Sequence, residues 1–335
     1  MHDQAAGPSP ASPDLSEGRA LSLAERLARI EQARVFYPRW SALLEEIAQC
    51  HAWRRLAGEP AEPYGLLVVG PTGVGKSKLV SSYAWAYPPV VAADAWGERT
   101  LRPVVQATIP TPATVKSLAV TLLIALGDPR PTSGTVVTMT DRLVRYIADC
   151  RVELLILDEL QHFVDRHSHR VLDDASNWLK LLLKTTKVSC VLVGLQHEPV
   201  ALLRANAQLG RLFGDPYVLD PFSWDDDRPE TIAEFRHVLA AVEGLMPLAE
   251  PSHLADGALA RPLFVASSGL MGLLMALIRR ATHLAVLRGQ EHLDATVLAD
   301  AFAHRLAGER RGVRNPFVPA PASPPVAAPP RRAAV

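Results

Sequence analysis

The 335-residue sequence has few cysteines, no net charge and no long uninterrupted apolar run. Its three cysteines, Cys50, Cys150 and Cys190, are far apart, so no pair has the spacing of a metal or redox site. An odd number of isolated cysteines is typical of a reducing compartment. We therefore expect three small buried side chains without disulfides.

Positive and negative side chains balance at 35 each, so the composition gives no overall basic field that would attract nucleic acid. Any contact with DNA must come from a local patch, or from one that is completed when several copies assemble. Apolar residues make up 48% of the chain and charged residues 21%, which is the composition of a globular protein.

Membrane and export signals are also missing from the sequence. The N-terminal residues lack the basic and apolar regions of a signal peptide. The most apolar stretch, residues 263–287, is interrupted by Arg279, Arg280 and His283, whereas a bilayer-spanning helix needs an uninterrupted run. We expect a cytoplasmic protein without a membrane partner, associated with the nucleoid when active.

Short apolar runs alternate with helical patterns through the middle of the chain. These runs are continuously apolar, which is typical of parallel strands that are covered on both faces. The sequence therefore predicts an α/β fold with a parallel five-stranded sheet, whose strands lie within residues 65–69, 104–109, 154–159, 190–194 and 217–222.

Helical patterns flank this core on both sides. Two precede it, separated near Tyr37 and Pro38, and the patterns after about residue 225 are all helical. The proline-rich end of the chain is either a segment that docks a partner or an inert terminus. We expect a disordered N-terminus (1–19), an N-terminal helical segment with a linker (20–60), an α/β nucleotide-binding domain (61–224), an α-helical lid (225–311) and a disordered tail (312–335).

A glycine-rich loop follows the first apolar run and fits the phosphate-loop pattern G-x-x-x-x-G-K-S, with a strand before it and a helix after it. The backbone amides of such a loop form an anion-binding nest at a helix N-terminus. Lys76 is expected to reach the β- and γ-phosphates of ATP, and Ser77 to ligate Mg²⁺. The expected binding residues are Gly70, Pro71, Thr72, Gly73, Val74, Gly75, Lys76, Ser77 and Lys78.

Two carboxylates, Asp158 and Glu159, end the apolar run "LLILDE". In open α/β sheets, ligands bind at the edge where strands end. We expect Asp158 to hold the hydrated Mg²⁺ and Glu159 to polarise the attacking water, so that the site hydrolyses ATP. An Asp-Glu pair is common in loops, and this interpretation depends on its occurring together with the phosphate loop.

Arg211 precedes the last apolar run and is a candidate for action on a neighbouring subunit. An arginine there could stabilise transition-state charge on that subunit's γ-phosphate, and a surface loop arginine explains it equally well. Arg204 is the second candidate for this role.

Weaker patterns surround two further groups of polar residues. Thr111, Thr114 and Lys116 follow the second run and are candidate phosphate contacts on DNA, although a solvated helix position is the simpler explanation for Lys116. The group of His162, His167 and His169 lacks a standard metal-ligand spacing, so we expect structural or solvent-exposed roles for it.

Together these residues resemble the AAA+ ATPases, and more narrowly the TniB/TnsC-type regulators of DNA transposition. The resemblance runs from about residue 29 to 308 and depends on "GPTGVGKS" and "LLILDE", with softer support from "YPRW", "DELQH" and "SSGLMG". It implies a P-loop AAA+ core with N-terminal helices and a small C-terminal α-helical lid. Members of this family bind ATP, assemble head to tail on duplex target DNA, and couple target choice to a DDE-type transposase.

The resemblance implies a slow ATPase that assembles as a ring or filament with ATP and disassembles on hydrolysis. The implied partners are double-stranded target DNA, a TniA/TnsB-like transposase, a TniQ-like target-selection protein and further copies of the chain. Two positions depart from the wider pattern. Leu195 stands where a small polar sensor is usual, so either Gln196 substitutes or sensing of the γ-phosphate is weak. Gly272 stands three residues after Gly269, where many AAA+ proteins have a sensor arginine, which leaves Arg279 or Arg280 as candidates for that role.

Two other functions fit the same motifs. One is a helicase loader of the DnaC type or an IstB-like helper ATPase, although those proteins tend to be shorter. The other is a nucleotide-gated signalling or defence module, in which long sensor or repeat domains would be expected.

Overall fold

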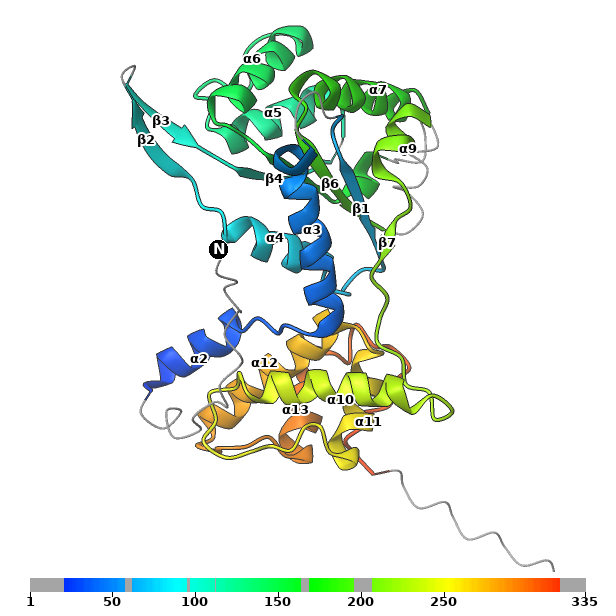
Figure 1. The fold of residues 1–335 in the computed structure, drawn as a ribbon. Helices are drawn as coiled ribbons and strands as arrows, with labels where there is room; N and C mark the ends of the chain where they lie inside the picture. The colour runs from blue at the N-terminus through cyan, green and yellow to red at the C-terminus, as the bar shows by residue number, and fades with distance from the viewer. Residues whose placement is uncertain are drawn as a thin grey trace, which may run out of the picture. The chain divides into compact units, whose positions relative to one another are not determined.

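The computed structural model describes residues 21–57, 62–94, 97–111, 113–163, 169–195 and 207–319. The expected N-terminal segment 1–19, the tail from residue 320, and Gln196, Arg204 and His167 lie outside these described residues. The described chain divides into two units (Figure 1). One contains residues 36–223 and 270–272, and the other contains residues 21–35, 224–269 and 273–319.

Five parallel strands form the centre of the first unit, in the order β4-β5-β6-β1-β7. This confirms the predicted sheet, although the last run, 217–222, contributes only two residues as strand because β7 lies at an edge and pairs only with β1. The strands are β1 (Gly65–Val69), β4 (Val104–Thr108), β5 (Leu154–Asp158), β6 (Ser189–Gly194) and β7 (Tyr217–Val218).

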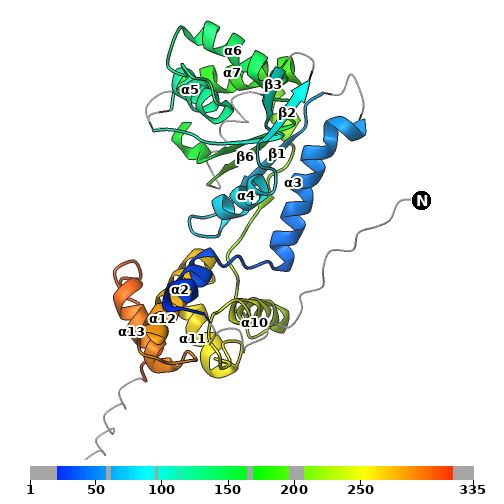
Figure 2. The same ribbon diagram turned by 90° about the vertical axis from the view of Figure 1, so that its left-hand side faces the viewer.

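Helices cover both faces of this sheet. The first face packs against α5 (Val115–Leu126), α6 (Val136–Asp149), α7 (His169–Thr186) and α9 (Ala207–Phe213). Figure 2 shows α3 (Pro38–Ala57) and α4 (Lys76–Trp85) on the other face. Every residue of β1, β5 and β6 is buried, which explains why their sequences are continuously apolar.

The position of β1 determines where a ligand can bind. β1 lies between β6 and β7, so the chain leaves the first strand at a point where the strand order reverses. Parallel strands end at a common edge, which brings together the loops after β1, β5 and β6. In open α/β sheets this crevice is the usual ligand site.

A two-stranded antiparallel ribbon was not foreseen from the sequence. It consists of β2 (Val90–Asp94) and β3 (Gly97–Leu101) and forms a sheet of its own, beside the main sheet in Figure 1. Val90 and Val91 are more than half exposed. Residues 90–93 are a short apolar run, but β3 reads Gly-Glu-Arg-Thr-Leu, so the pair does not show the continuous apolar pattern of the core strands.

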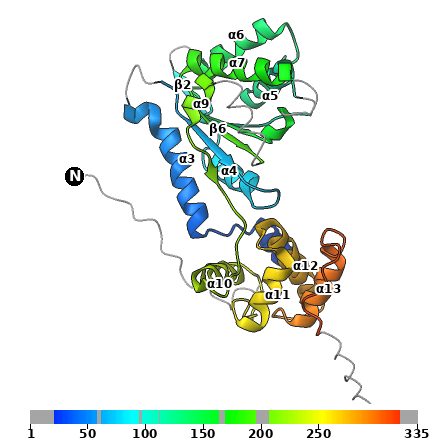
Figure 3. The same ribbon diagram turned by 90° about the vertical axis from the view of Figure 1, so that its right-hand side faces the viewer.

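The second unit is helical, as predicted for the lid, and Figure 3 shows its helices from another side. Its largest buried side chains include Phe235, Leu263, Ile278 and Phe302. The helices are α2 (Leu23–Gln32), α10 (Pro229–Glu243), α11 (Gly257–Ser267), α12 (Met271–Leu287), whose first two residues are grouped with the sheet unit, and α13 (Ala295–Arg305).

Helix α2 packs on these C-terminal helices through buried polar contacts. Arg26 donates to the Glu291 carboxylate at 2.7 Å and to the Pro247 carbonyl at 2.9 Å. From α12, Arg279 donates to the carbonyl of Ile30 at 3.3 Å. The stretch 20–60 therefore contributes to both units, α2 to the helical one and α3 to the sheet.

Within the described ranges, no single helix is long and apolar enough to cross a bilayer. Helices α11 and α12 reach that length and hydropathy only when taken together, and they are bent by 119° at the break between them.

The three cysteines are buried and unpaired. Burial raises the pKa of the Cys50 thiol to about 12 and raises the pKa of Cys190 well above its usual value. These thiols therefore behave as the small apolar side chains that the sequence predicted.

Candidate nucleotide-binding site

A cavity of about 300 Å³ lies at the edge of the sheet where the parallel strands end. It is enclosed by the loops after β1, β5 and β6 and by the first residues of α4 and α12. The lining residues are Thr72, Gly73, Gly75, Lys76, Ser77, Lys78, Asp158, Glu159, Gln161, Gly194, Leu195 and Gly272.

Glycine is required at several positions of the loop after β1. Gly73 and Gly75 have φ angles of +82° and +109°, in the left-handed region that side chains disfavour. A Cβ on Gly70 would lie 2.3 Å from the carbonyl oxygen of Leu219, because β7 runs directly alongside. The loop therefore exposes its backbone amides toward the N-terminus of α4, an arrangement suited to phosphate.

Lys76, the first residue of α4, is almost completely buried. Its ammonium group donates to the carbonyl oxygens of Gly70 at 2.7 Å and Pro71 at 2.9 Å. Burial lowers the pKa of Lys76, and the negative charges of Asp158 and Glu159 oppose that shift. The side chain is thus held beside the loop by weak carbonyl acceptors, which a phosphate group can replace.

Asp158 ends β5 and is buried, and its Oδ1 accepts a hydrogen bond from the backbone amide of Glu159 at 2.8 Å. Glu159 has a φ angle of +63°, an uncommon conformation for a residue other than glycine. Gln161 donates from Nε2 to the Glu159 carboxylate, while its own Oε1 is buried without a hydrogen-bond partner among the described residues. No pattern in the sequence singles out Gln161.

The oxygen donors in this cavity fit Mg²⁺. Asp158 supplies a carboxylate and the exposed Ser77 supplies a hydroxyl. This set fits because Mg²⁺ is usually bound by one or two carboxylates together with phosphates and water. The described part of the chain contains no group of three or more His, Cys, Asp or Glu side chains that would form an all-protein metal site.

Gly272 occupies the position at which many AAA+ proteins have an arginine. Its backbone amide donates to the carbonyl of Gly73 at 2.7 Å, and a Cβ there would lie 2.8 Å from the same oxygen. In the sequence, the Gly-x-x-Gly spacing indicated only that the sensor arginine is absent. In the structure, the glycine lets the backbone at the start of α12 contact the loop after β1 directly. Leu195 lines the cavity as well.

Trp40 in α3 is a second residue that sequence patterns did not assign to the site. Its indole is buried and stacks on Tyr37, with ring centroids 5.7 Å apart. Nε1 would lie 3.6 Å from a Cβ on Gly75 and has no hydrogen-bond partner in the part of the chain that the structure describes. The "YPRW" string therefore packs directly behind the glycine-rich loop.

Arg211 does not line the nucleotide cavity. It is exposed on α9 and lines a different pocket, next to Gly65 at the start of β1. The loop that begins at Gly70 lies at the other end of this strand, roughly 16 Å away. Arg279, considered as a sensor arginine, contacts Ile30 and Glu31 of α2 instead.

The candidate DNA contacts, Thr111, Thr114 and Lys116, are all exposed. Thr114 also has a local structural role, because it is the N-cap of α5. Its hydroxyl accepts from the amide of Ser117 at 3.0 Å, and its own amide donates to the Ser117 hydroxyl at 2.8 Å.

His162 links two loops beside the site. Its Nδ1 lies 2.7 Å from the carbonyl oxygen of Ile109, so it connects the segments that follow β4 and β5. This is the structural role expected for it.

Comparison with known sequences gives one family. A model of the family described as bacterial TniB protein matches residues 26–222, which is more than half of the chain. No curated protein sequence matches significantly.

Solved structures with the same fold include origin-recognition and Cdc6 proteins. The Aeropyrum pernix ORC2 protein, solved as ADPNP-ADP complexes, aligns with a TM-score of 0.59 and 17% identity over 83% of this chain and 70% of its own. Pyrobaculum aerophilum Cdc6p aligns with a TM-score of 0.60 and 15% identity, over 83% of this chain and 71% of its own. Aeropyrum pernix ORC1, solved in complex with DNA, aligns with a TM-score of 0.53 and 19% identity, over 81% of this chain and 66% of its own. At these identities the likeness shows the AAA+ fold alone.

Proposed function

The chain belongs to the TniB family, and we propose that it is an ATP-dependent regulator of DNA transposition that assembles on double-stranded target DNA. One observation carries the proposal: Lys76, Ser77, Asp158 and Glu159 line a single cavity behind a glycine-rich loop. The AAA+ fold supports it, because proteins of this fold have been solved with ADPNP and ADP and with DNA.

In this proposal residues 70–78 bind the phosphates of ATP. Lys76 exchanges the carbonyls of Gly70 and Pro71 for phosphate oxygens, which are better acceptors for a buried ammonium group. Ser77 and Asp158 hold Mg²⁺, which neutralises charge on the phosphates. Trp40 supports the loop from behind.

Hydrolysis requires two further groups. Glu159 accepts a proton from the attacking water, and Arg211 of one copy stabilises the γ-phosphate bound by the next. Turnover is slow, because Leu195 and Gly272 replace polar groups that assist the reaction in many AAA+ proteins. ATP therefore acts mainly as an assembly signal, and hydrolysis drives disassembly.

Head-to-tail contacts between identical subunits produce a ring when they close and a filament when they do not. Thr111, Thr114 and Lys116 contact DNA phosphates without reading sequence. The assembled protein recruits a DDE-type transposase of the TniA/TnsB kind together with a TniQ-like protein. We place this activity in the cytoplasm at the nucleoid, with residues 61–224 as the nucleotide-binding domain and 225–311 as the lid.

Negative-stain microscopy and sedimentation test the proposal, each with and without duplex DNA and a slowly hydrolysed ATP analogue. Parent protein should form rings or filaments only when both are present. Lys76→Ala should lose nucleotide binding and assembly, whereas Lys184→Ala, an exposed change on α7 outside the cavity, should retain both. Glu159→Gln should assemble and stay assembled with ATP. Monomers under all conditions, or normal assembly of Lys76→Ala, would overturn the proposal.

Gene neighbourhood separates this function from that of a helicase loader. An adjacent gene for an integrase-type transposase is expected for a transposition regulator. That transposase should then bind the ATP- and DNA-dependent assembly in a pull-down and fail to bind Lys76→Ala.

A further inference from the structure

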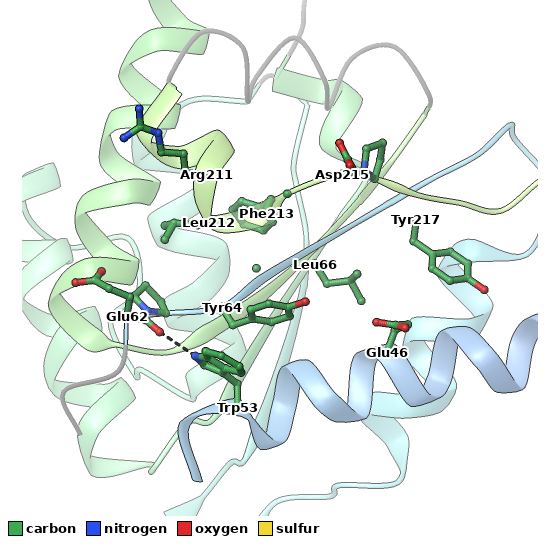
Figure 4. A pocket seen from close by; sticks show the side chains of 14 residues that line it. Glu46, Trp53, Glu62, Tyr64, Leu66, Arg211, Leu212, Phe213, Asp215 and Tyr217 are labelled. Carbon is green, nitrogen blue, oxygen red and sulfur yellow. Dashed lines mark hydrogen bonds between the residues drawn. The ribbon is translucent and has the colours of Figure 1, made fainter. Parts of the chain in front are cut away.

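A second pocket, of about 500 Å³, lies in the sheet unit at the start of β1 and away from the nucleotide cavity (Figure 4). It is formed by α3, the segment entering β1, α9 and the loop before β7. Aromatic and acidic side chains dominate its lining, namely Trp53, Tyr64 and Tyr217 with Glu46, Glu62 and Asp215.

The aromatic side chains form an accessible, fixed surface. The rings of Trp53 and Tyr64 lie 5.0 Å apart at an angle of 30°, and the two residues are 38% and 37% exposed. Trp53 Nε1 donates to the carbonyl of Glu62 at 3.0 Å, which holds the indole in place. An exposed pair of rings with a fixed orientation is suited to bind a flat or extended ligand.

The charge of the pocket is negative. Glu62 is paired with Lys187 at 3.3 Å, whereas Glu46 and Asp215 make no hydrogen bond or ion pair within the described residues. Arg211 also lines the pocket, but Figure 4 shows that its guanidinium group points away from Tyr64 and away from Glu46 and Asp215. Two unpaired carboxylates in the same pocket as an aromatic pair favour a cationic ligand.

The chain itself carries a segment with the complementary chemistry. Residues 320–335 read "APASPPVAAPPRRAAV", with five prolines, two adjacent arginines and no acidic residue. Proline-rich segments dock in aromatic-lined grooves at low entropic cost, and an arginine guanidinium both stacks on aromatic rings and pairs with carboxylates. At about 3.1 Å per residue, an extended segment of this length reaches roughly 50 Å.

We propose that this pocket binds the C-terminal segment of the chain. Pro329 and Pro330 pack on the Trp53–Tyr64 surface, and Arg331 and Arg332 lie at Glu46 and Asp215.

Zero-length cross-linking tests this proposal on the full chain without ATP or DNA, so its result does not depend on the proposed function. Arg332→Lys keeps the positive charge and adds an amine that carbodiimide can join to a carboxylate. We expect mass spectrometry to find residue 332 linked to Glu46 or Asp215. The Lys187–Glu62 ion pair provides an internal reference cross-link.

A matched pair of tryptophan variants tests the aromatic surface. In the Arg332→Lys background, Trp53→Leu leaves both carboxylates but should lower the yield of the cross-link about two- to five-fold. Trp85→Leu, which changes a more exposed tryptophan outside the pocket, should leave the yield unchanged. Cross-links of residue 332 only to other carboxylates, or none while Lys187–Glu62 still forms, would overturn the proposal, as would an unchanged yield with Trp53→Leu.

Discussion

Gln161 holds the carboxylate of Glu159 by donating a hydrogen bond from its side-chain amide. The bond joins the residue expected to polarise water to a side chain two positions later, within the same cavity. Glu159 has left-handed backbone geometry, so its side chain points where an ordinary strand residue would not. Gln161 thus positions the carboxylate relative to the phosphate loop.

Replacing Gln161 by alanine should reduce the rate of ATP hydrolysis without changing nucleotide affinity. Misplacing a reacting group by about 1 Å can cost up to 10²-fold in rate, so we expect a fall in kcat of roughly ten-fold or more. Gln106→Ala, which removes a glutamine that donates to Ser81 outside the cavity, is the control. If kcat is unchanged or rises while the dissociation constant stays constant, Gln161 does not hold Glu159 in its reactive position.

The backbone contact between Gly272 and Gly73 predicts that even a methyl group is harmful there. A Cβ on Gly272 would lie 2.8 Å from a backbone oxygen, which cannot move without displacing the phosphate loop. Overpacking of this kind costs about 1–3 kcal/mol, so Gly272→Ala should weaken ATP binding on the order of ten-fold, measured by calorimetry. Gly308→Ala, whose Cβ would meet open space, should bind like the parent. Equal affinities for the two variants would contradict this role.

The core strands and the phosphate loop were predictable because their signals are local. β1, β5 and β6 are buried along their whole length, which leaves a continuous apolar run in the sequence. The loop after β1 requires glycine at fixed spacings, and the acidic pair directly follows a buried strand. These patterns located the cavity and most of its polar lining.

Other features depend on contacts that no local pattern records. Gly272 meets Gly73 from almost 200 residues away, and Trp40 reaches Gly75 from a helix that precedes the sheet. The β2–β3 ribbon is exposed although residues 90–93 are apolar, so its local sequence does not record its position. Helix α2 joins the C-terminal helices through Arg26, a residue that looks like an ordinary surface arginine in the sequence.

The buried thiol of Cys50 predicts a loss of stability in alkaline solution. Burial raises its pKa to about 12, whereas in the unfolded chain it ionises near 8.5. Its stabilising contribution is therefore complete below about pH 8.5 and is lost as the pH rises toward 12.

Between pH 9 and 10.5 this contribution should fall by about 2 kcal/mol, which is measurable by urea unfolding. Lys76 has the opposite effect because burial lowers its pKa, so the useful quantity is the difference between the parent and Cys50→Ala. The variant is expected to have a shallower decline in its free energy of unfolding with pH. Parallel pH profiles would show that Cys50 ionises equally in both states.

The position of Arg211 predicts complementation between defective subunits. It lies on α9 near the start of β1, and the phosphate loop lies at the other end of that strand, so one chain does not bring the two together. If Arg211 acts on the neighbouring copy, Arg211→Ala should bind ATP and DNA normally but hydrolyse little, and Glu159→Gln should assemble with ATP but be inactive because it lacks the carboxylate that accepts the proton of water.

A mixture of these two variants should recover activity, because an Arg211→Ala subunit keeps an intact nucleotide site and a Glu159→Gln neighbour, which still assembles, provides an arginine. With random mixing in a head-to-tail assembly, roughly a quarter of the interfaces pair an intact site with an intact arginine. The ATPase rate should therefore approach about a quarter of the parent rate when the two variants are mixed before ATP and DNA are added. Arg204→Ala changes the second candidate arginine and should hydrolyse ATP like the parent if Arg211 has this role. A mixture no more active than its components, with both variants still assembling with parent subunits, would remove Arg211 from the catalytic group and leave Arg204→Ala as the variant to examine in the same assay.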